Sequence, residues 1–444
     1  MNKILISFIL LVDLAGCATA YKRIVYNEKI KDNESLQIKE GLLSQEAQRI
    51  SYLKDDKEYA VIKLSEPVII AQAQQEERWG YFQFPSIGIA EQGTLVVSWQ
   101  MNADTEKAYG TKTGREPVPM ISKDKGKTWQ PQDKKYNRYV RGYNVRLDDG
   151  RVLQVVNPKA KDMNTYKRSV KAVSKKGGTS FYRMDKLPEE LQGVYLNYEN
   201  PDNTVKSIHA RINDPELLRA STQDLMPVVW WGNIKQQSDG ALVAGVYPTY
   251  YLDSNGKVMP GSVSFYKSND KGQSWDILGK IPFVNDGIAD KLGDGCFEEP
   301  AFEILADGSF ICVMRSGSTS PMYETYSTDG GKTWTTPEPF TPNGVKPMLM
   351  RLKNNVLVLA SGRPGVQLRF NLDGLGKEWT DPIDMVPFMN DNGTYTRDVS
   401  CGYVSVVELD DDSFYMVYSD FTTKNEEGET RKSIMGRKVT ITKK

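Results

Sequence analysis

The chain has 444 residues, 39% of them hydrophobic and 26% charged, which is enough for one large globular core and excludes a disordered chain. Its 57 basic residues balance its 57 acidic residues, so no basic excess drives binding to nucleic acid. No shift in composition marks a second folded domain. The 8 Trp and 23 Tyr suit both a β-sheet core and contact with sugars.

The first residues have the pattern of an export signal. Lys3 precedes an apolar run over residues 4–12, and the sequence LAGC follows at residues 14–17. This pattern resembles the bacterial lipoprotein signal, which implies cleavage before Cys17, lipidation of its thiol and residence in the periplasm or at the outer membrane. An ordinary secretory signal is the alternative, and the run is shorter than the roughly 20 residues of a membrane span. We assign residues 1–17 to the signal and 18–70 to an N-terminal segment with a closing strand.

From residue 71 onward, strand-like apolar runs repeatedly close on a tight turn. Six such hairpins have their turns at residues 92–93, 149–150, 239–240, 307–308, 354–355 and 411–412. Each turn is flanked by residues of high β propensity. One region, about 183–225, lacks this pattern, and we expect an irregular inserted arm with short helices there.

The pattern S-x-D-x-G-x-[TS]-W follows three of these hairpins in full. Its specified residues are Ser122, Asp124, Gly126, Thr128 and Trp129, then Ser268, Asp270, Gly272, Ser274 and Trp275, then Ser327, Asp329, Gly331, Thr333 and Trp334. Weaker copies are Asn371, Asp373, Gly376 and Trp379, and Ser174, Gly177, Gly178, Thr179 and Phe181. In such a turn Asp and Ser bond local backbone groups, Gly supplies a positive φ angle and Trp packs the turn onto a neighbouring sheet.

These repeats resemble the Asp boxes of sialidase-type β-propellers. The resemblance implies an all-β fold in which residues 71–444 form a six-bladed β-propeller of four-stranded sheets, closed on itself as a monomer. The boxes of that family lie at the blade periphery, so we expect each Asp-box tryptophan to be packed within its blade and away from the centre. The chemistry must then come from the centre of the ring.

Neither a metal nor another cofactor is expected. After removal of the signal the thiols are Cys296, Cys312 and Cys401, an odd number that argues against a disulfide framework. The sequence has no C-x-x-C pair and a single histidine, His209, so it offers no cluster with metal-ligand spacing.

The sialidase resemblance can be followed through the centre residue by residue. The first-blade strand that carries an arginine in sialidases reads YFQFP at residues 81–85, so Gln83 stands at the position of the first of three arginines that bind the sugar carboxylate. Trp79 lies just before it as an expected sugar contact, and Arg78 is an alternative cation. An amide cannot make the charge-assisted bidentate bond of a guanidinium, so weak cleavage of ordinary sialosides is expected.

The acidic residues of the centre follow from the same resemblance. Asp104, in the loop after the next strand, matches the general acid/base, with Glu106 as the alternative. Glu299 matches the glutamate that takes a proton from a tyrosine, with Glu298 in reserve, because adjacent strand residues face opposite sides. Arg315 on the following strand matches the second arginine.

The last two hairpins complete the predicted site. Arg363, between glycine and proline in a turn, is our choice for the third arginine, and Arg369 is the alternative. Tyr403 opens the strand of the sixth hairpin and matches the nucleophile. A phenol with a pKa near 10 needs a carboxylate to take its proton, and the resemblance gives that task to Glu299.

Three functions remain open from the sequence. The first is an exo-acting glycoside hydrolase for a terminal, acidic sugar of a glycan or polysaccharide-derived oligosaccharide. The second is a lyase or dehydratase acting on uronic-acid oligosaccharides, with His209 or Tyr247, Tyr250 and Tyr251 around a uronate neutralised by Arg315. The third is a propeller that only binds glycans.

Overall fold

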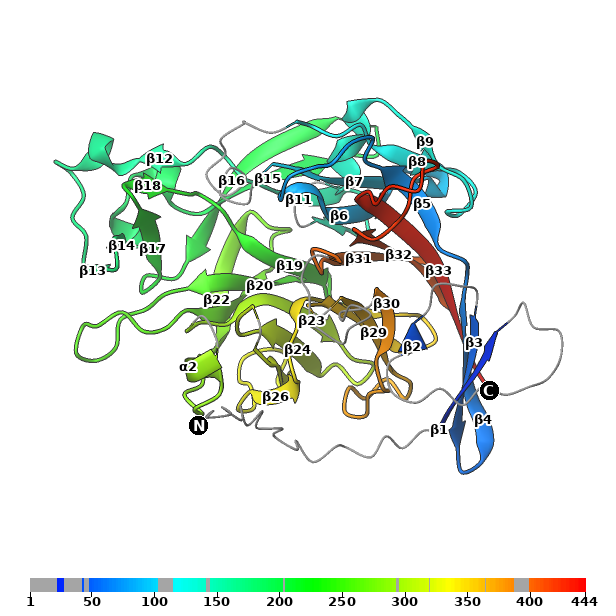
Figure 1. Cartoon of the computed structure of the whole chain (residues 1–444). Helices are drawn as coiled ribbons and strands as arrows, with labels where there is room; N and C mark the ends of the chain where they lie inside the picture. Colours follow the sequence, from blue (N-terminus) through cyan, green and yellow to red (C-terminus); the bar gives the residue numbers. More distant parts are fainter. Residues whose placement is uncertain are drawn as a thin grey trace, which may run out of the picture.

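The structure is a computed structural model of the chain. It describes residues 22–27, 42–43, 48–102, 115–140, 144–202, 204–292, 295–318, 320–363, 365–386 and 399–444. The described part is almost entirely β-structure (Figure 1). Its helices are the single-turn α2 (Ala289–Leu292) and the 3-10 helices η1 (Glu91–Gly93), η2 (Lys134–Val140), η3 (Met163–Tyr166), η4 (Met184–Lys186) and η5 (Glu189–Leu191).

Antiparallel four-stranded units follow one another along the chain. The first is β6 (Tyr81–Ile89), β7 (Leu95–Met101), β8 (Met120–Ser122) and β9 (Gln130–Pro131). The second is β10 (Asn144–Arg146), β11 (Val152–Val156), β15 (Val194–Glu199) and β16 (Val205–Asn213), and the third is β19 (Trp231–Gln236), β20 (Leu242–Thr249), β21 (Ser262–Ser268) and β22 (Ser274–Ile281). The outer strands β16 and β22 pair in parallel and join these two units into one eight-stranded sheet.

Two further units complete this series. One is β23 (Glu298–Ile304), β24 (Phe310–Arg315), β25 (Met322–Ser327) and β26 (Glu338–Thr341). The next is β27 (Val345–Arg351), β28 (Leu357–Gly362), β29 (Val366–Asn371) and β30 (Ile383–Val386), to which β2 (Leu42–Leu43) adds in parallel.

The last sheet combines both ends of the described chain. Its strands are β31 (Val404–Asp410), β32 (Ser413–Asp420) and β33 (Ser433–Lys443), followed by β4 (Lys57–Leu64), β3 (Gln48–Lys54) and β1 (Lys22–Asn27), and β5 (Val68–Gln72) also pairs with β33. β33 thus lies between a C-terminal and an N-terminal strand. Hydrogen bonds between segments far apart in the sequence close this sheet.

The first strands of the units contact one another in sequence. β10 contacts β19, β19 contacts β23, β23 contacts β27, β27 contacts β31, and β31 contacts β6. In Figure 1 the sheets accordingly follow one another around the molecule in chain order, with β31 to β33 beside β6. This succession is typical of a β-propeller, in which the first strand of each sheet lines the centre.

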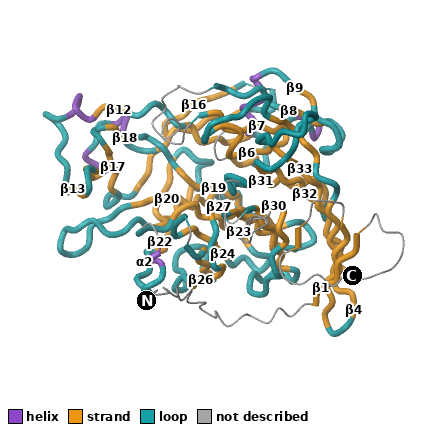
Figure 2. Tube along the Cα trace, viewed as in Figure 1, coloured by secondary structure: helices purple, strands orange, loops and turns teal. Residues whose placement is uncertain are grey.

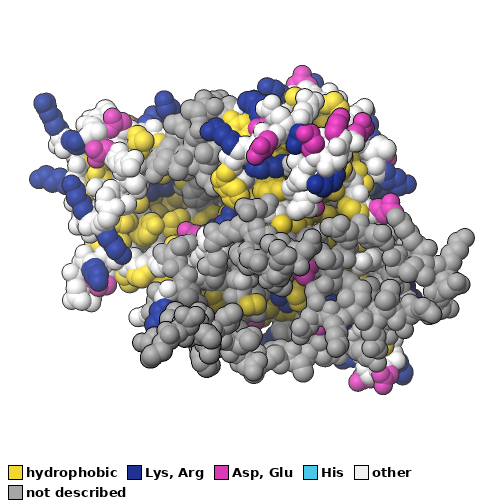
Figure 3. All heavy atoms as spheres, in the orientation of Figure 1, with side chains coloured by type: hydrophobic (Ala, Val, Ile, Leu, Met, Phe, Trp, Pro, Cys, Tyr) yellow, Lys and Arg dark blue, Asp and Glu magenta, His cyan; other side chains and the backbone are white. Residues whose placement is uncertain are grey.

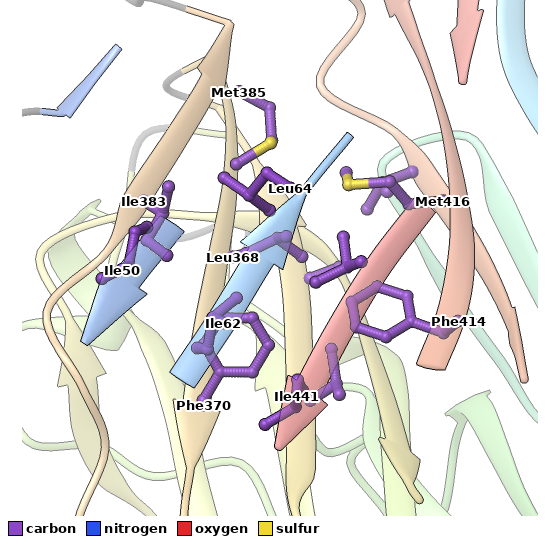
Figure 4. Packing of buried hydrophobic residues seen from close by; sticks show 14 of the residues in the cluster. Ile50, Ile62, Leu64, Leu368, Phe370, Ile383, Met385, Phe414, Met416 and Ile441 are labelled. Atoms are coloured by element: carbon purple, nitrogen blue, oxygen red, sulfur yellow. The ribbon is translucent and has the colours of Figure 1, made fainter. Parts of the chain in front are cut away.

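The largest core cluster lies where the last sheet meets the unit of β27 to β30. Side chains from β3, β4, β29, β30, β32 and β33 interdigitate there, among them Ile50, Ile62, Phe370, Phe414 and Ile441 (Figure 4). Each of these five is completely buried. Burying such side chains stabilises the fold by roughly 1.5–3 kcal/mol each, so the N-terminal strands are bound to the rest of the molecule by apolar packing as well as by pairing.

The three full Asp boxes share one geometry, each at the turn between the third and fourth strands of its unit. In the box of β21 and β22, Asp270 accepts bonds from Ser268 Oγ (2.7 Å) and from the backbone and hydroxyl of Ser274 (2.9 and 2.6 Å). Gly272 has a φ of 88°, and Trp275 Nε1 donates to its carbonyl (3.1 Å). The degenerate copy behaves alike, because Asn371 Oδ1 accepts from Gly376 N (3.0 Å).

The Asp-box tryptophans pack against the preceding unit as well as their own. Trp334 stacks on Phe265 of β21 with 4.4 Å between ring centroids, and Trp129 lies 5.6 Å from Tyr415 of β32. The expectation that each stays within its blade is therefore corrected for Trp129 and Trp334, whose indoles bridge two sheets. Beside it the backbone must pass close to the neighbour, since a Cβ on Gly126 would lie 2.0 Å from the Tyr415 ring.

The inserted arm differs from its predicted bounds. A separate five-stranded sheet forms from β12 (Lys161–Asp162), β18 (Leu225–Met226), β17 (Leu218–Thr222), β14 (Thr179–Arg183) and β13 (Ser174–Lys176). It rises at the left of Figure 2 together with short helical turns. β15 and β16 lie inside the expected range 183–225 but belong to the second unit.

The weak Asp-box copy at Ser174 was therefore misplaced. Ser174 and Phe181 pair across the β13–β14 hairpin of the insertion. The corresponding turn of the second unit lies between β15 and β16, where Thr204 Oγ1 donates to Asp202 (2.6 Å). Within the described part of the chain, no helix has the length and apolarity needed to cross a membrane.

Candidate active site

Three first strands begin with the same backbone distortion. In each, a residue with positive φ precedes a proline: Phe84 (48°) in β6, Glu299 (50°) in β23 and Lys346 (48°) in β27. The pairing register shifts by one residue at each of these points, which defines a β-bulge. Bulges re-aim a side chain, and a positive φ outside glycine costs of order 1–3 kcal/mol, so three of them at one strand position point to a functional centre.

The bulged residues meet at Tyr403. Its hydroxyl donates a short hydrogen bond to Glu299 Oε1, and the Phe84 ring lies edge-on to the Tyr403 ring with 4.4 Å between centroids. The backbone N–H of Lys346 donates to the other carboxylate oxygen of Glu299 (2.8 Å). Glu299 is only 7% exposed. The carboxylate is thus held in one orientation, with one oxygen on the phenol and the other on the neighbouring unit.

Two guanidinium groups flank this pair. Arg315 Nη1 lies 3.4 Å from Glu299 Oε2, and its Nε lies 3.6 Å from Glu298 Oε2. Bonds to Gly317 O (3.1 Å) and Ser318 Oγ (2.9 Å) fix its position. Arg363 has a φ of 46°, and its guanidinium carbon lies 5.8 Å from the centroid of the Tyr403 ring.

The environment keeps the Tyr403 phenol protonated in the free protein. Burial raises its pKa well above the ordinary value, and the charge and hydrogen bond of Glu299 raise it further, while Arg315 and Arg363 act in the opposite direction. The proton therefore stays on the phenol, which donates it in a hydrogen bond to Glu299. The phenol becomes a nucleophile only as this carboxylate accepts the proton.

The segment before Tyr403 is packed tightly against the end of β28. Arg363 Nε donates to Cys401 O (3.2 Å). A Cβ on Gly362 would lie 1.7 Å from the carbonyl of Gly402, so only glycine permits this approach. The buried Cys401 thiol lies 2.9 Å from Ser419 Oγ and accepts from the backbone of Phe84 (3.4 Å). These contacts fix the arginine and the tyrosine relative to each other.

Gln83 and Trp79 occupy different environments. Gln83 is 0% exposed, and neither of its amide atoms has a hydrogen-bond partner among the residues that the structure describes. Trp79 is 50% exposed in the loop before β6. The Arg78 guanidinium lies over the Tyr81 ring (4.7 Å to the ring centroid) and donates to its hydroxyl (3.1 Å), which places it beside the first residue of β6.

The remaining predicted residues separate into two groups. Asp104 and its alternative Glu106 lie outside the described residues. Arg369 lies on β29, where it is close to Tyr52, Asp381 and Asp384 and where burial lowers its pKa. It is not in contact with Tyr403, so of the two candidate arginines the structure brings Arg363 to the pair.

Most residues of the lyase hypothesis make packing or hydrogen-bond contacts away from Tyr403. The exposed His209 ring stacks on Tyr195 (4.1 Å between centroids), and its Nε2 lies 2.8 Å from Gln192 O. The Tyr251 hydroxyl donates to the buried Asp214 (2.8 Å), and Tyr247 packs against an apolar core. Tyr250 lies closer to the site. Burial raises its pKa to about 12, and the nearby charges of Cys296 and Glu298 contribute to this increase.

The sequence carries a signal for Lys346, which was not among the predicted site residues. Phe84-Pro85, Glu299-Pro300 and Lys346-Pro347 open three first strands in the same register. A repeated residue–proline step would have selected Lys346 together with Glu299. No group of three or more metal-ligating side chains occurs among the described residues.

Comparisons with known proteins agree with this architecture. The BNR/Asp-box repeat family matches residues 325–336, and no curated protein matches the chain. A protein of unknown function from Dyadobacter fermentans has a similar crystal structure, with a TM-score of 0.58 and 20% identity over 86% of this chain and 99% of that chain. This likeness shows a shared fold.

Two named enzymes have weaker structural likeness. One is the Hadza microbial sialidase Hz136, with a TM-score of 0.47 and 14% identity over 91% of this chain and 74% of that chain. The other is an α-L-arabinanase of Penicillium chrysogenum, with a TM-score of 0.46 and 16% identity over 86% and 98%. What the comparisons establish is an all-β chain with an Asp-box repeat and a fold that other proteins share.

Proposed function

We propose that the protein is a glycoside hydrolase that removes a terminal, acidic sugar from a glycan or a polysaccharide-derived oligosaccharide. The observation that carries the proposal is the buried Tyr403–Glu299 hydrogen bond between Arg315 and Arg363. A neutral nucleophile beside two cations suits an anionic sugar, which a carboxylate nucleophile would repel. We also infer six blades, from the six first strands, which contact one another in the order β10, β19, β23, β27, β31 and β6.

Each step of the reaction has a residue in this scheme. The Tyr403 oxygen attacks the anomeric carbon while its proton passes to Glu299, and the bond to the leaving group breaks. Asp104 is proposed to protonate the leaving oxygen. Water then attacks the glycosyl–tyrosine bond with Asp104 as base, and Glu299 returns the proton to the departing phenolate.

Gln83 limits the choice of sugar. Arginine donates two charge-assisted bonds to a carboxylate, and an amide in its place weakens binding of a buried anion by roughly 1.5–3 kcal/mol. An ordinary α-sialoside is therefore expected to be cleaved weakly or not at all. Efficient release of N-acetylneuraminic acid from a fluorogenic sialoside would contradict this expectation.

The test of the proposal is a screen of the purified protein against fluorogenic glycosides and oligosaccharides with acidic or neutral ends. Release of a terminal acidic sugar is expected, and Tyr403→Phe should reduce it to near background because the covalent intermediate cannot form. Tyr250→Phe is the matched control and should retain turnover. Wild-type turnover by Tyr403→Phe would exclude this mechanism. Formation of a 4,5-unsaturated product, seen by ultraviolet absorption, would favour a lyase built around Tyr250.

We propose in addition that Cys17 carries a lipid. The support is the sequence alone, an apolar run followed by LAGC at residues 14–17. Labelling with a radioactive fatty acid in a bacterial host should mark the wild-type protein and not Cys17→Ala. Equal labelling of both would rule out this anchor.

A further inference from the structure

A dense group of cations covers the inserted sheet. Residues 159–176, called the basic ridge below, hold six lysines and Arg168 against one acidic residue, Asp162. All seven cationic side chains are exposed. In Figure 3 lysine and arginine side chains project from this part of the molecule, at the left. The chain as a whole has no net charge, so this concentration is local.

The described cations of the basic ridge form no ion pair within 4.0 Å, and only the charge of Lys161 acts on a nearby carboxylate, that of Glu190. Among the described residues, ion pairs within 4.0 Å join many other lysines and arginines, such as Lys235 to Glu303 (2.6 Å) and Lys271 to Asp149 (2.9 Å). None of the seven ridge cations forms one. Unpaired like charges repel one another, so an arrangement that places seven of them together is stabilised when an anion binds.

The inserted sheet is connected to the candidate active site. Phe181 of β14 lies edge-on to Tyr250, with 5.2 Å between ring centroids, and pairs with Ser174 at the start of β13. Tyr250 is close enough to Glu298 for the charge of this carboxylate to affect its pKa. The insertion begins after β11, the second strand of its unit. In the unit of β23 to β26, the second strand is β24, and its end carries Arg315, which pairs with Glu298. The two positions are equivalent ends of second strands. The basic ridge thus rises beside the centre, on the same rim.

We propose that the basic ridge binds the anionic chain of an acidic polysaccharide whose end enters the site at Tyr403. The inference rests on the proposed function and gives its substrate a class: a polymer with repeated carboxylate or sulfate groups. A polymer is favoured over a membrane surface, because a bilayer against this rim would cover the centre. A chain with regularly spaced anions can follow the ridge and still leave its terminal sugar in the site.

The experiment measures binding without turnover. Tyr403→Phe protein is titrated with size-fractionated polygalacturonate at about 0.05 M salt, where screening between exposed charges is weak. The ridge variant carries Lys167→Glu, Arg168→Glu and Lys171→Glu in addition. The control variant carries Lys123→Glu, Lys127→Glu and Lys332→Glu, an equal charge change at exposed positions in Asp-box turns. Thermal unfolding verifies that all three proteins are folded.

The ridge variant should bind polygalacturonate at least about tenfold more weakly, and the control variant should stay within about twofold. Dextran, a neutral polymer, should bind none of them. Equal losses in both variants, or no binding by the parent, would overturn the proposal. So would tighter binding to anionic phosphatidylglycerol vesicles than to the polymer. Because no turnover is involved, failure of the hydrolase proposal would leave this result readable on its own.

Discussion

At the scale of single residues, the Glu299 carboxylate accepts the hydrogen bond of the Tyr403 phenol. Glu299→Gln keeps a hydrogen-bond acceptor in place and removes the base, so kcat at neutral pH should fall by about 10²- to 10⁴-fold with the fold intact. The substitution also removes one of the causes that raise the pKa of Tyr403, while Arg315 and Arg363 still lower it. The residual activity should therefore increase with pH more steeply than that of the wild type. Glu298→Gln is the matched control, and a larger loss there would reverse the assignment.

The buried Glu324 carboxyl should make the stability of the protein depend on pH. Burial raises the pKa of this carboxyl to about 7, while the nearby polar groups of Tyr326 and Trp379 act in the opposite direction. The folded state then binds more protons than the unfolded state between about pH 4.5 and 7, so the stability falls as pH rises through this window. Glu324→Gln should remove that slope and raise stability at pH 8 by about 1–3 kcal/mol. Urea unfolding at pH 5 and 8 measures both; Glu338→Gln, at an exposed neighbour, should leave the slope in place.

At the scale of elements, the Asp box is a turn held by its own side chains. Asp270→Ala deletes the acceptor for Ser268 and Ser274 and should cost about 1–3 kcal/mol of unfolding free energy. The active-site geometry lies elsewhere, so kcat per folded molecule should not change. Asp239→Ala, which removes an acceptor for one backbone N–H and an exposed ion pair with Lys267 (3.6 Å), should cost less. A loss of kcat in Asp270→Ala with normal stability would contradict a structural role for the box.

Local patterns in the sequence predicted elements well where the turn chemistry is local. The hairpin turns and three full Asp boxes lie where expected, because Asp, Gly and Trp act within eight residues. The predicted Asp-box copy at Ser174 was wrong because the glycine-containing β13–β14 hairpin of the insertion has a sequence similar to that of an Asp box. The pairing of Tyr403 with Glu299 came from a resemblance in order along the chain, and the structure brings the two side chains together. The bulge at Lys346 depends on pairing between β27 and β28, and the burial of Arg369 depends on contacts that include Tyr52. Both features arise from residues far apart in the sequence, so no local sequence pattern predicts them.

At the scale of the whole molecule, closure depends on β33. This strand pairs with β32 on one side and with β4 and β5 on the other. Arg437, which is 0% exposed, donates to the carbonyl of Ser65 (2.7 Å) across the junction. Deleting residues 433–444 should therefore abolish cooperative unfolding in calorimetry. Deleting residues 1–47, whose described strands β1 and β2 lie at sheet edges, should leave a cooperative transition. A cooperative transition without β33 would show that the ring needs no closing strand.

This closure also sets the order in which the chain can fold. Leu64 pairs with Val439, and the difference in position, 439 minus 64, is 375 residues. During synthesis one edge of β4 therefore stays unpaired until β33, near the end of the polypeptide, has been made. Contacts between such distant segments slow folding, and a waiting strand edge is open to pairing with other chains. Aggregation during production should accordingly increase with expression rate, and a chaperone that shields β4 would act on a step that no change at the active site can reach.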